Sequence, residues 1–123
     1  LIGGDGSDVI TGGAGSDTMS GGSGADRFVF SDLTDSNGTS SHDLIFDFSA
    51  AEGDRLDLSG IDAWLGNGDQ SFVFIGSSGF SGLRGEVRFD AGLLQANTGR
   101  DLSADLQVDL LGVNQLNETQ LIL

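Results

Sequence analysis

The chain lacks several residue types on which other proteins depend. It has no cysteine, so disulfides and thiol redox chemistry are excluded. It also has no proline and no lysine, and its five basic residues are all arginines. Nineteen acidic residues outnumber these five, which gives a formal net charge of -14. Nucleic acids and anionic membranes are bound mainly through clustered Lys and Arg, so we expect neither as a partner, whereas cations suit this charge.

Other absences bound the class of protein. No hydrophobic run approaches the roughly 20 residues of a membrane-spanning helix, so we expect no membrane insertion. No basic segment followed by an apolar stretch, the mark of a signal peptide, is visible at the N-terminus. A single histidine, His42, excludes the HExxH zinc motif of metallopeptidases. The length of 123 residues suits one domain.

Glycine, in contrast, is abundant at 21 of 123 residues, and much of it forms a tandem repeat. Residues 3–11, 12–20 and 21–29 are three copies of Gly-Gly-x-Gly-x-Asp-x-U-x, in which U is a large apolar residue. This nonapeptide is the signature of a parallel β-roll that binds calcium. Leu1 occupies the U position of an earlier copy, so we expect the chain to be the C-terminal part of a longer protein.

The phase of the repeat predicts its geometry. The first six residues of each copy should form a turn and the last three a short strand, with Ile10, Met19 and Phe28 facing inward. Two copies make one coil, so loops 3–8 and 21–26 should stack on one edge and loop 12–17 should lie on the other. The alternative is a disordered Gly-rich linker, in which the periodic apolar residues would have no purpose.

From residue 27 the pattern changes to alternating and β-branched segments, which predict strands. The predicted strands are residues 27–30, 43–49, 55–61, 71–76, 85–90 and 105–113. Residues 31–42 should be a polar loop with a turn at Asn37-Gly38, and residues 62–70 a loop or a single helical turn. The predicted fold is all-β: a calcium-bound parallel β-roll (1–30), followed by a β-sheet or sandwich (31–123) that caps its open end. Together they form one domain.

The aspartates and exposed carbonyls of the loops are the candidate ligands, because calcium takes six to eight oxygens and tolerates backbone carbonyls. One site should join loops one and three through the carboxylates of Asp8 and Asp26. A second should join loop two to the next segment on its edge, which offers Asp32, Asp35 and Asp43. The candidate metal-site residues are Gly3, Asp5, Asp8, Gly12, Ala14, Asp17, Gly22, Gly24, Asp26, Asp35 and Asp43.

The repeats, GADRFVFSDLTDS, HDLIFDFSAAEGDRLDLSGIDA, SFVFIG and the LQVDLLGVNQLNETQLIL end together resemble the C-terminal module of RTX exoproteins. The pattern is similar to that of serralysin-type metalloproteases and of the R-modules of mannuronan C5-epimerases. The resemblance covers nearly the whole chain, and it supports Asp35 and Asp43 as partners of Asp17. Residues 90–105 depart from the serralysin pattern, which leaves the parent protein open between a metalloprotease, an epimerase and an adhesin.

The resemblance implies a non-catalytic, monomeric module of a secreted, extracellular protein that folds on calcium after export by a type I secretion apparatus. Residues 116–123 resemble an acidic-then-apolar export signal, although a final β-strand would have the same composition. His42 is a poor catalytic candidate, because serines and aspartates are so common here that some will lie near any histidine. Trp64 suits packing better than stacking on a sugar. With the charge of -14, binding of an acidic polysaccharide is expected to be weak.

Overall fold

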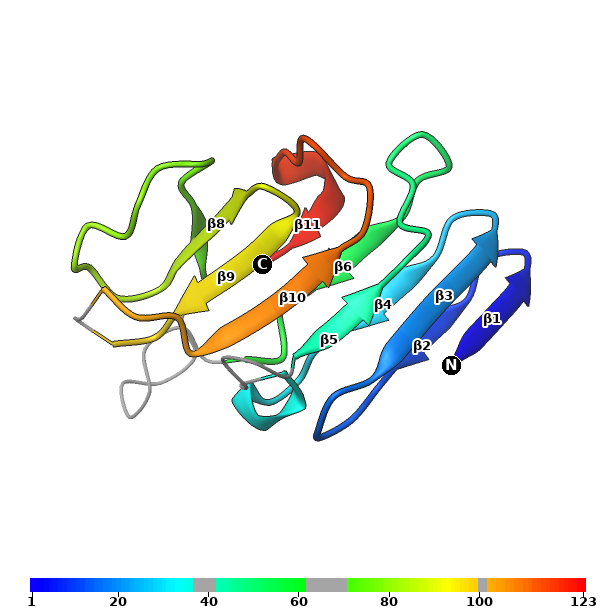
Figure 1. The fold of residues 1–123 in the computed structure, drawn as a ribbon, viewed down its shortest axis with the longest axis horizontal. Helices are drawn as coiled ribbons and strands as arrows, with labels where there is room; N and C mark the ends of the chain where they lie inside the picture. The colour runs from blue at the N-terminus through cyan, green and yellow to red at the C-terminus, as the bar shows by residue number, and fades with distance from the viewer. Residues whose placement is uncertain (37–41, 62–70, 100–101) are drawn as a thin grey trace.

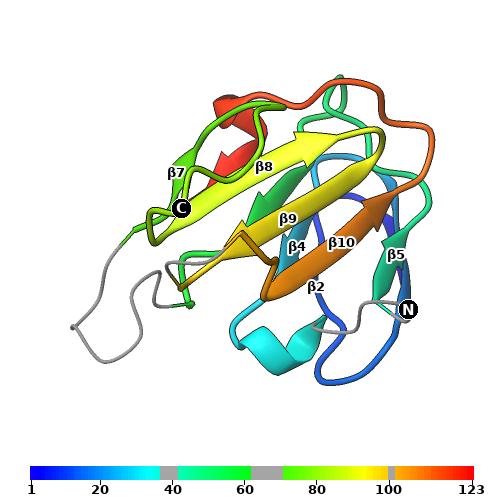
Figure 2. The same cartoon turned by 60° about the vertical axis from the view of Figure 1, so that its left-hand side comes forward.

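The computed structural model describes residues 1–36, 42–61, 71–99 and 102–123, which form two β-sheets (Figures 1 and 2). The strands are β1 (Ile2–Asp5), β2 (Val9–Thr11), β3 (Thr18–Ser23), β4 (Arg27–Val29), β5 (Asp43–Ile45), β6 (Arg55–Asp57), β7 (Val73–Phe74), β8 (Glu86–Asp90), β9 (Leu93–Asn97), β10 (Leu106–Leu110) and β11 (Leu121–Ile122). In these residues the helical elements are two 3-10 turns, η1 (Leu33–Asp35) and η2 (Glu118–Gln120), and no helix is long and apolar enough to span a membrane. The all-β prediction is confirmed.

Strands β1 to β6 alternate between the two sheets as the chain coils. The first sheet has the order β1-β3-β5-β10-β9-β8-β7 and the second the order β11-β6-β4-β2. Ile2 pairs with Ser20 and Val9 with Arg27, both in parallel and both 18 residues apart, as the two-nonapeptide coil predicts. The coil then continues past the third repeat, because β5 pairs in parallel with β3 and β6 with β4. We refer to residues 1–57 as the coiled segment.

Several predicted strand limits change. β1 and β3 run into the first half of their loops, since Gly4 and Gly22 pair in the same parallel register, so these strands are longer than the three residues expected. Most strands predicted after residue 30 are shorter than their apolar runs. Strand β9 was not predicted at all, because its sequence LLQAN lacks β-branched and aromatic residues. The Asn37-Gly38 turn and loop 62–70, with Trp64, lie outside the described residues.

The strands β8, β9 and β10, here called the capping strands, form an antiparallel unit that joins the coiled segment through β10. β10 runs parallel to β5, and β11 runs parallel to β6 at the edge of the second sheet. The buried side chains of both halves form one core: Ile10, Met19, Phe28, Phe30, Ile45, Phe48, Leu56, Leu58, Ile61, Phe72, Val87, Phe89, Leu94, Ala96, Leu106, Val108, Leu110 and Leu121. The inward orientation predicted for the apolar residue of each repeat is therefore confirmed.

Stacking of successive coils makes one glycine position sterically demanding. Gly22 has a positive φ of 93°, and a Cβ placed on it would collide with the carbonyl oxygen of Gly4 one coil earlier. Gly13 occupies the same repeat position with a φ of 83°, but a Cβ there would have no heavy atom within 4 Å. Both positions thus require a positive φ, but only Gly22 has the backbone of another coil close to it.

This difference gives a matched pair of variants. Both Gly13→Ala and Gly22→Ala should destabilise the protein by about 1–2 kcal/mol, because an L-residue resists positive φ. Gly22→Ala should cost roughly 1–3 kcal/mol more, since the added methyl group forces two backbones apart. Chemical denaturation of both variants measures the difference. Equal losses of stability would show that the coils do not stack as closely as described.

Candidate metal centre

The aspartates of the repeats stack along two edges of the coiled segment. On the first edge, the amide of Asp8 donates to Oδ1 of Asp26 at 2.9 Å, and the amide of Asp26 donates to Oδ1 of Asp54 at 3.0 Å. On the second edge, the amide of Asp17 donates to Oδ1 of Asp43 at 2.7 Å. The structure therefore brings Asp8 together with Asp26, 18 residues apart as the coil period predicts, and Asp17 together with Asp43, one of the three acids that the sequence offers on the second edge.

Asp54 was missed in the sequence because it lies outside the glycine repeat. Its turn, residues 49–54, reads SAAEGD and keeps only the aspartate of the Gly-Gly-x-Gly-x-Asp pattern. The residues that follow could have identified Asp54, since Asp54-Arg55-Leu56 repeats the acid, arginine and apolar order of Asp26-Arg27-Phe28. The β4–β6 pairing places these two triplets side by side.

The second oxygen of these carboxylates is the unusual feature of the site. Among the described residues, four buried side-chain oxygens have no hydrogen-bond partner, and all four are Oδ2 atoms, of Asp8, Asp17, Asp26 and Asp43. Asp26 is 2% exposed and Asp43 is fully buried. Burying a charged oxygen without a partner is strongly unfavourable unless a cation compensates it. Within the part of the chain that the structure describes, each edge thus presents a pair of carboxylate oxygens that lack a hydrogen-bond donor.

The first glycine of each repeat leaves room for these oxygens. A Cβ on Gly3 would lie 2.7 Å from Oδ2 of Asp8, and one on Gly12 would lie 2.9 Å from Oδ2 of Asp17. In the third repeat, a Cβ on Gly21 would collide with Oδ2 of Asp26. A side chain at this position would occupy the space beside the unpartnered oxygen, so the glycines keep that space open.

Backbone carbonyls surround the same turns. The carbonyl oxygens of Gly4 and Gly6 lie against Gly22 and Gly24 of the next coil, and the Gly21 carbonyl lies beside Gly3. No three Asp, Glu, His or Cys side chains of the described residues gather around one point. An ion held here would therefore take most of its ligands from backbone carbonyls, which calcium accepts readily.

The remaining predicted residues have other surroundings. Asp5 is exposed, and its carboxylate accepts a hydrogen bond from the Ser23 hydroxyl at 2.8 Å; Ala14 is also exposed. Asp35 is buried, and its Oδ2 accepts the amides of Ser31 and Asp32 at 2.9 and 3.1 Å. One oxygen of Asp35 is thus already committed to capping η1.

Asp47 and Asp32 are carboxylates that the protein itself satisfies. Burial acts to raise the pKa of Asp47, but hydrogen bonds from the Ser20 hydroxyl and the amides of Gly22 and Gly21 lower it overall. Backbone and hydroxyl hydrogen bonds from Thr34 likewise lower the pKa of Asp32. These hydrogen bonds stabilise the charged forms of Asp47 and Asp32 without a metal.

Asp43 shows the opposite behaviour. Burial raises its pKa to about 6, the negative charges of Asp17 and Asp35 add to the rise, and the hydrogen bond from the Asp17 amide opposes it. Burial also raises the pKa of Asp54. Ionisation of Asp43 and of Asp54 therefore destabilises the folded protein when no cation is bound.

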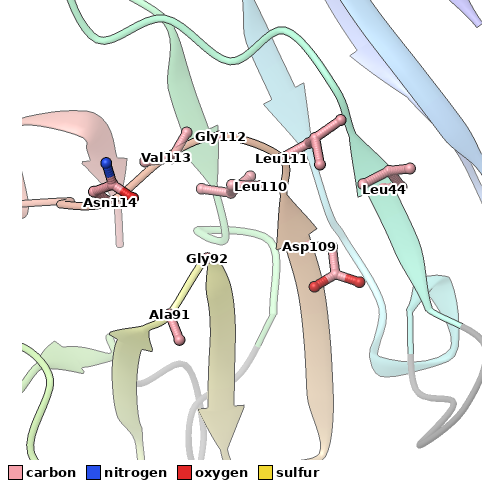
Figure 3. Close-up of a pocket in the computed structure, with 9 residues that line it drawn as sticks. All are labelled: Leu44, Ala91, Gly92, Asp109, Leu110, Leu111, Gly112, Val113 and Asn114. Carbon is pink, nitrogen blue, oxygen red and sulfur yellow. The ribbon is translucent and has the colours of Figure 1, made fainter.

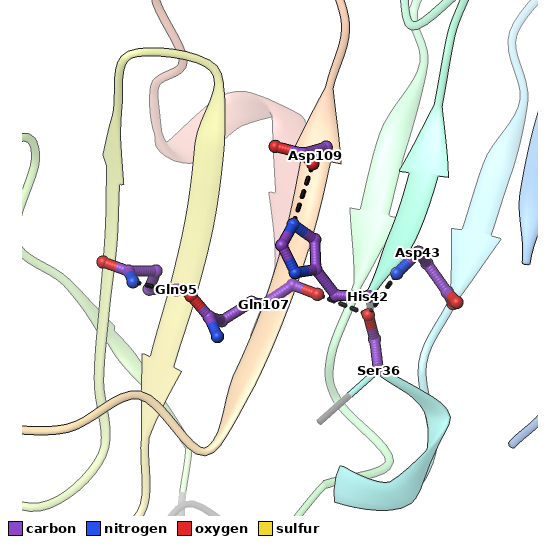
Figure 4. A network of polar contacts seen from close by, with 6 residues as sticks. All are labelled: Ser36, His42, Asp43, Gln95, Gln107 and Asp109. Carbon is purple, nitrogen blue, oxygen red and sulfur yellow. Dashed lines mark hydrogen bonds and ion pairs between the residues drawn. The ribbon is translucent and has the colours of Figure 1, made fainter. Parts of the chain in front are cut away.

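Two further features lie where β10 meets the coiled segment. His42 Nε2 lies 2.8 Å from Oδ2 of Asp109, but the fully buried hydroxyl of Ser36 donates its proton to the Gln107 carbonyl (Figure 4). Among the described residues, a cleft of about 400 Å³ beside Leu44 and Leu110 has Asp109 as its one ionisable lining group (Figure 3).

The raised pKa of Asp43 predicts how the metal-free protein responds to pH. As pH rises from about 4 to 7, the unfolded chain releases its proton near the ordinary value of 3.8, whereas folded Asp43 holds it until about 6. The unfolded state is favoured by this difference, so stability should fall across that window. Asp54 contributes in the same direction, whereas the lowered pKa values of Asp32 and Asp47 act below it.

Urea midpoints of metal-free protein across this pH range, in a buffer with a stabilising osmolyte that keeps the protein folded without calcium, provide the measurement. The Asp43→Asn variant is the control, because it has no titrating group at this position and its stability should depend less on pH. A wild-type midpoint that rises between pH 5 and 7 would contradict the described burial of Asp43.

Comparison with known proteins agrees with the geometry. The family described as peptidase M10 serralysin C terminal matches residues 1–123, the full length of the chain. No curated protein matches the chain significantly. The resemblance found in the repeats and the strands that follow them is therefore confirmed, and the chain belongs to the peptidase M10 serralysin C-terminal family.

Proposed function

We propose that this chain is a calcium-dependent folding module, in which ions bound along the two edges of the coiled segment complete the native state. The observation that carries the proposal is the set of four buried Oδ2 atoms without hydrogen-bond partners, on Asp8, Asp17, Asp26 and Asp43. Calcium fits them better than a softer metal, because the four unpartnered atoms are carboxylate oxygens and the chain has no cysteine.

The ions are proposed to lie between stacked loops. One would join loops 3–8 and 21–26 through Asp8 and Asp26, and another would join loop 12–17 to Asp43. The carbonyls of the glycine turns would supply the remaining ligands, with Asp35 close to the second ion. Each calcium would offset two units of the net charge of -14, so a few ions would leave the module acidic.

The family context gives this chemistry a setting. The serralysin C-terminal region is a non-catalytic module of secreted peptidases. We propose that the module stays unfolded inside the cell, passes a type I secretion apparatus as an extended chain, and folds outside. Calcium sites of the extracellular class have dissociation constants of roughly 10⁻⁴–10⁻³ M, so the low calcium of the cytosol would leave them unfilled.

Binding to the folded state alone would stabilise it by mass action. A site filled at a calcium concentration a hundredfold above its dissociation constant contributes about 2.7 kcal/mol. For an acidic, glycine-rich chain, a contribution of this size from each edge is a large part of a typical total stability of about 5–15 kcal/mol. Calcium would thus decide whether the coiled segment is folded.

The first test compares stability with calcium and with chelator for the wild type and Asp43→Asn. The wild type should gain about 2.7 kcal/mol or more on calcium addition, and magnesium should not substitute, because it requires a smaller octahedral site. Asp43→Asn should be at least as stable as the wild type in chelator, since it removes a buried charge, and should gain less from calcium.

Asp90→Asn is the control variant, because Asp90 lies in a capping strand with its side chain 59% exposed. Its response to calcium should equal that of the wild type. An Asp43→Asn variant that gains as much from calcium as Asp90→Asn would exclude Asp43 as a ligand, and a wild type that ignores calcium would exclude the proposed function.

A second test asks which aspartates share an ion. Asp8→Asn and Asp26→Asn should each lower the calcium-dependent stabilisation, and the double variant should lose little more than either single one, because residues of one site are not additive. Asp8→Asn with Asp17→Asn should instead add, with a second loss of about 2.7 kcal/mol. Isothermal titration and denaturation of the three single and two double variants measure this. Additive losses for Asp8 with Asp26 would mean that they bind separate ions.

A further inference from the structure

The two edges of the coiled segment differ in what they connect. The first edge links turns of the coil to one another, through the Asp8, Asp26 and Asp54 contacts. The second edge contains Asp43, which is also the first residue of β5, the strand that carries the capping strands. In the parallel β5–β10 ladder, Asp43 is the register partner of Val108. Asp43 therefore belongs to the candidate metal site and to the junction between the two halves of the fold.

Ser36 connects these two roles (Figure 4). Its hydroxyl accepts a hydrogen bond from the Asp43 amide at 2.7 Å and donates to the carbonyl oxygen of Gln107. The Gln107 amide in turn donates to the Ser36 carbonyl at 2.8 Å. Ser36 is fully buried. Its two hydrogen bonds with Gln107 continue the β5–β10 ladder by one residue, from a segment that is not part of β5.

These contacts fix Asp43 from two sides. Its amide is held by Ser36, and its Oδ1 receives the amide of Asp17 from loop 12–17. Its Oδ2 is the unpartnered oxygen that an ion would contact. A cation at Oδ2 would restrain the carboxylate against loop 12–17, and that restraint passes through the Asp43 backbone to Ser36 and Gln107. The equivalent amide on the first edge, that of Asp26, is held by Asp54 within the coiled segment.

We propose that Ser36 is a positioning residue that couples calcium binding at the Asp17–Asp43 edge to the docking of the capping strands on the coiled segment, and that the Asp8–Asp26 edge is not coupled in this way. The inference rests on the proposed function. Because coupling between two equilibria is reciprocal, docked capping strands raise the calcium affinity of the second edge by the same factor by which calcium favours docking.

The test is a calcium titration of the full chain followed by nuclear magnetic resonance, in which the amides of the two edges report separately. Gly4 and Gly6 report on the first edge, and Gly13 and Gly15 on the second. In Ser36→Ala, the calcium midpoint of the second-edge amides should move about tenfold higher, within the 5- to 150-fold range of typical couplings. The first-edge midpoint should stay within about twofold of the wild type, since that edge is separated from Ser36.

Two further variants separate positioning from general stability. Ser36→Thr keeps the hydroxyl and should restore most of the second-edge affinity. Ser81→Ala removes a hydroxyl that donates to the buried carboxylate of Glu86, the first residue of β8, at 2.7 Å. This variant weakens the capping strands away from both edges, so it should move neither calcium midpoint selectively. A selective second-edge shift in Ser81→Ala, or equal shifts of both edges in Ser36→Ala, would overturn the proposal.

Hydrogen exchange in the wild type tests the coupling even if Ser36→Ala does not fold. Protection of the Val108 and Leu110 amides should rise together with the second-edge resonances as calcium is added. Protection that follows the first edge, or that is complete before calcium binds, would overturn the coupling while leaving calcium binding intact. A wild type whose loop resonances do not respond to calcium would refute the proposed function itself.

Discussion

The stacking of buried carboxylates is the constraint on which the rest of this structure depends. The amides of Asp8 and Asp17 are satisfied by Oδ1 of the aspartate in the next coil. The same contact brings a second anionic oxygen into the protein, where it has no donor. A backbone requirement is thus met at an electrostatic cost, because burial desolvates the carboxylate and like charges lie nearby, and both raise the pKa of Asp43. The coiled segment therefore satisfies the amides of Asp8 and Asp17, but it leaves the second carboxylate oxygens of the stacked aspartates without donors.

Glycine makes this arrangement possible in two ways. The first glycine of a repeat leaves space beside the carboxylate, as at Gly21, and the second allows adjacent coils to approach closely, as at Gly22. The apolar core is narrow within the coil, where each strand contributes few inward residues. Much of the apolar burial comes instead from the capping strands, whose side chains Val87, Leu94 and Val108 belong to the same core as Phe28. The two halves thus share one apolar core.

The connection between the halves is polar as well as apolar. Ser36 and Gln107 exchange hydrogen bonds at the point where β5 begins, and His42 contacts Asp109 beside them. Buried polar contacts of this kind fix a register, because any shift leaves donors and acceptors unsatisfied. The junction therefore sets where β10 docks, while the apolar side chains provide the burial.

The sequence by itself determined the features that follow from a fixed period. The nine-residue spacing sets the inward positions of Ile10, Met19 and Phe28, and the 18-residue coil sets the pairing of Asp8 with Asp26. These two inferences succeed because every copy of a repeat meets the same local demands, so the pattern and the geometry carry the same information. The absence of cysteine and the excess of acidic residues predict cations as partners, and that prediction rests on composition alone.

Tertiary structure decided what lies outside the period. Asp54 joins the first edge across an offset of 28 residues, and Asp43 joins the second across 26, because the turns that separate them from the repeats have lengths that no repeat fixes. Strand β9 forms because β8 and β10 pair with it on both sides, although its own residues do not favour a strand. The contact of Ser36 with Gln107 spans 71 residues, and a side chain at that separation finds its partner only when both sheets have packed around one core.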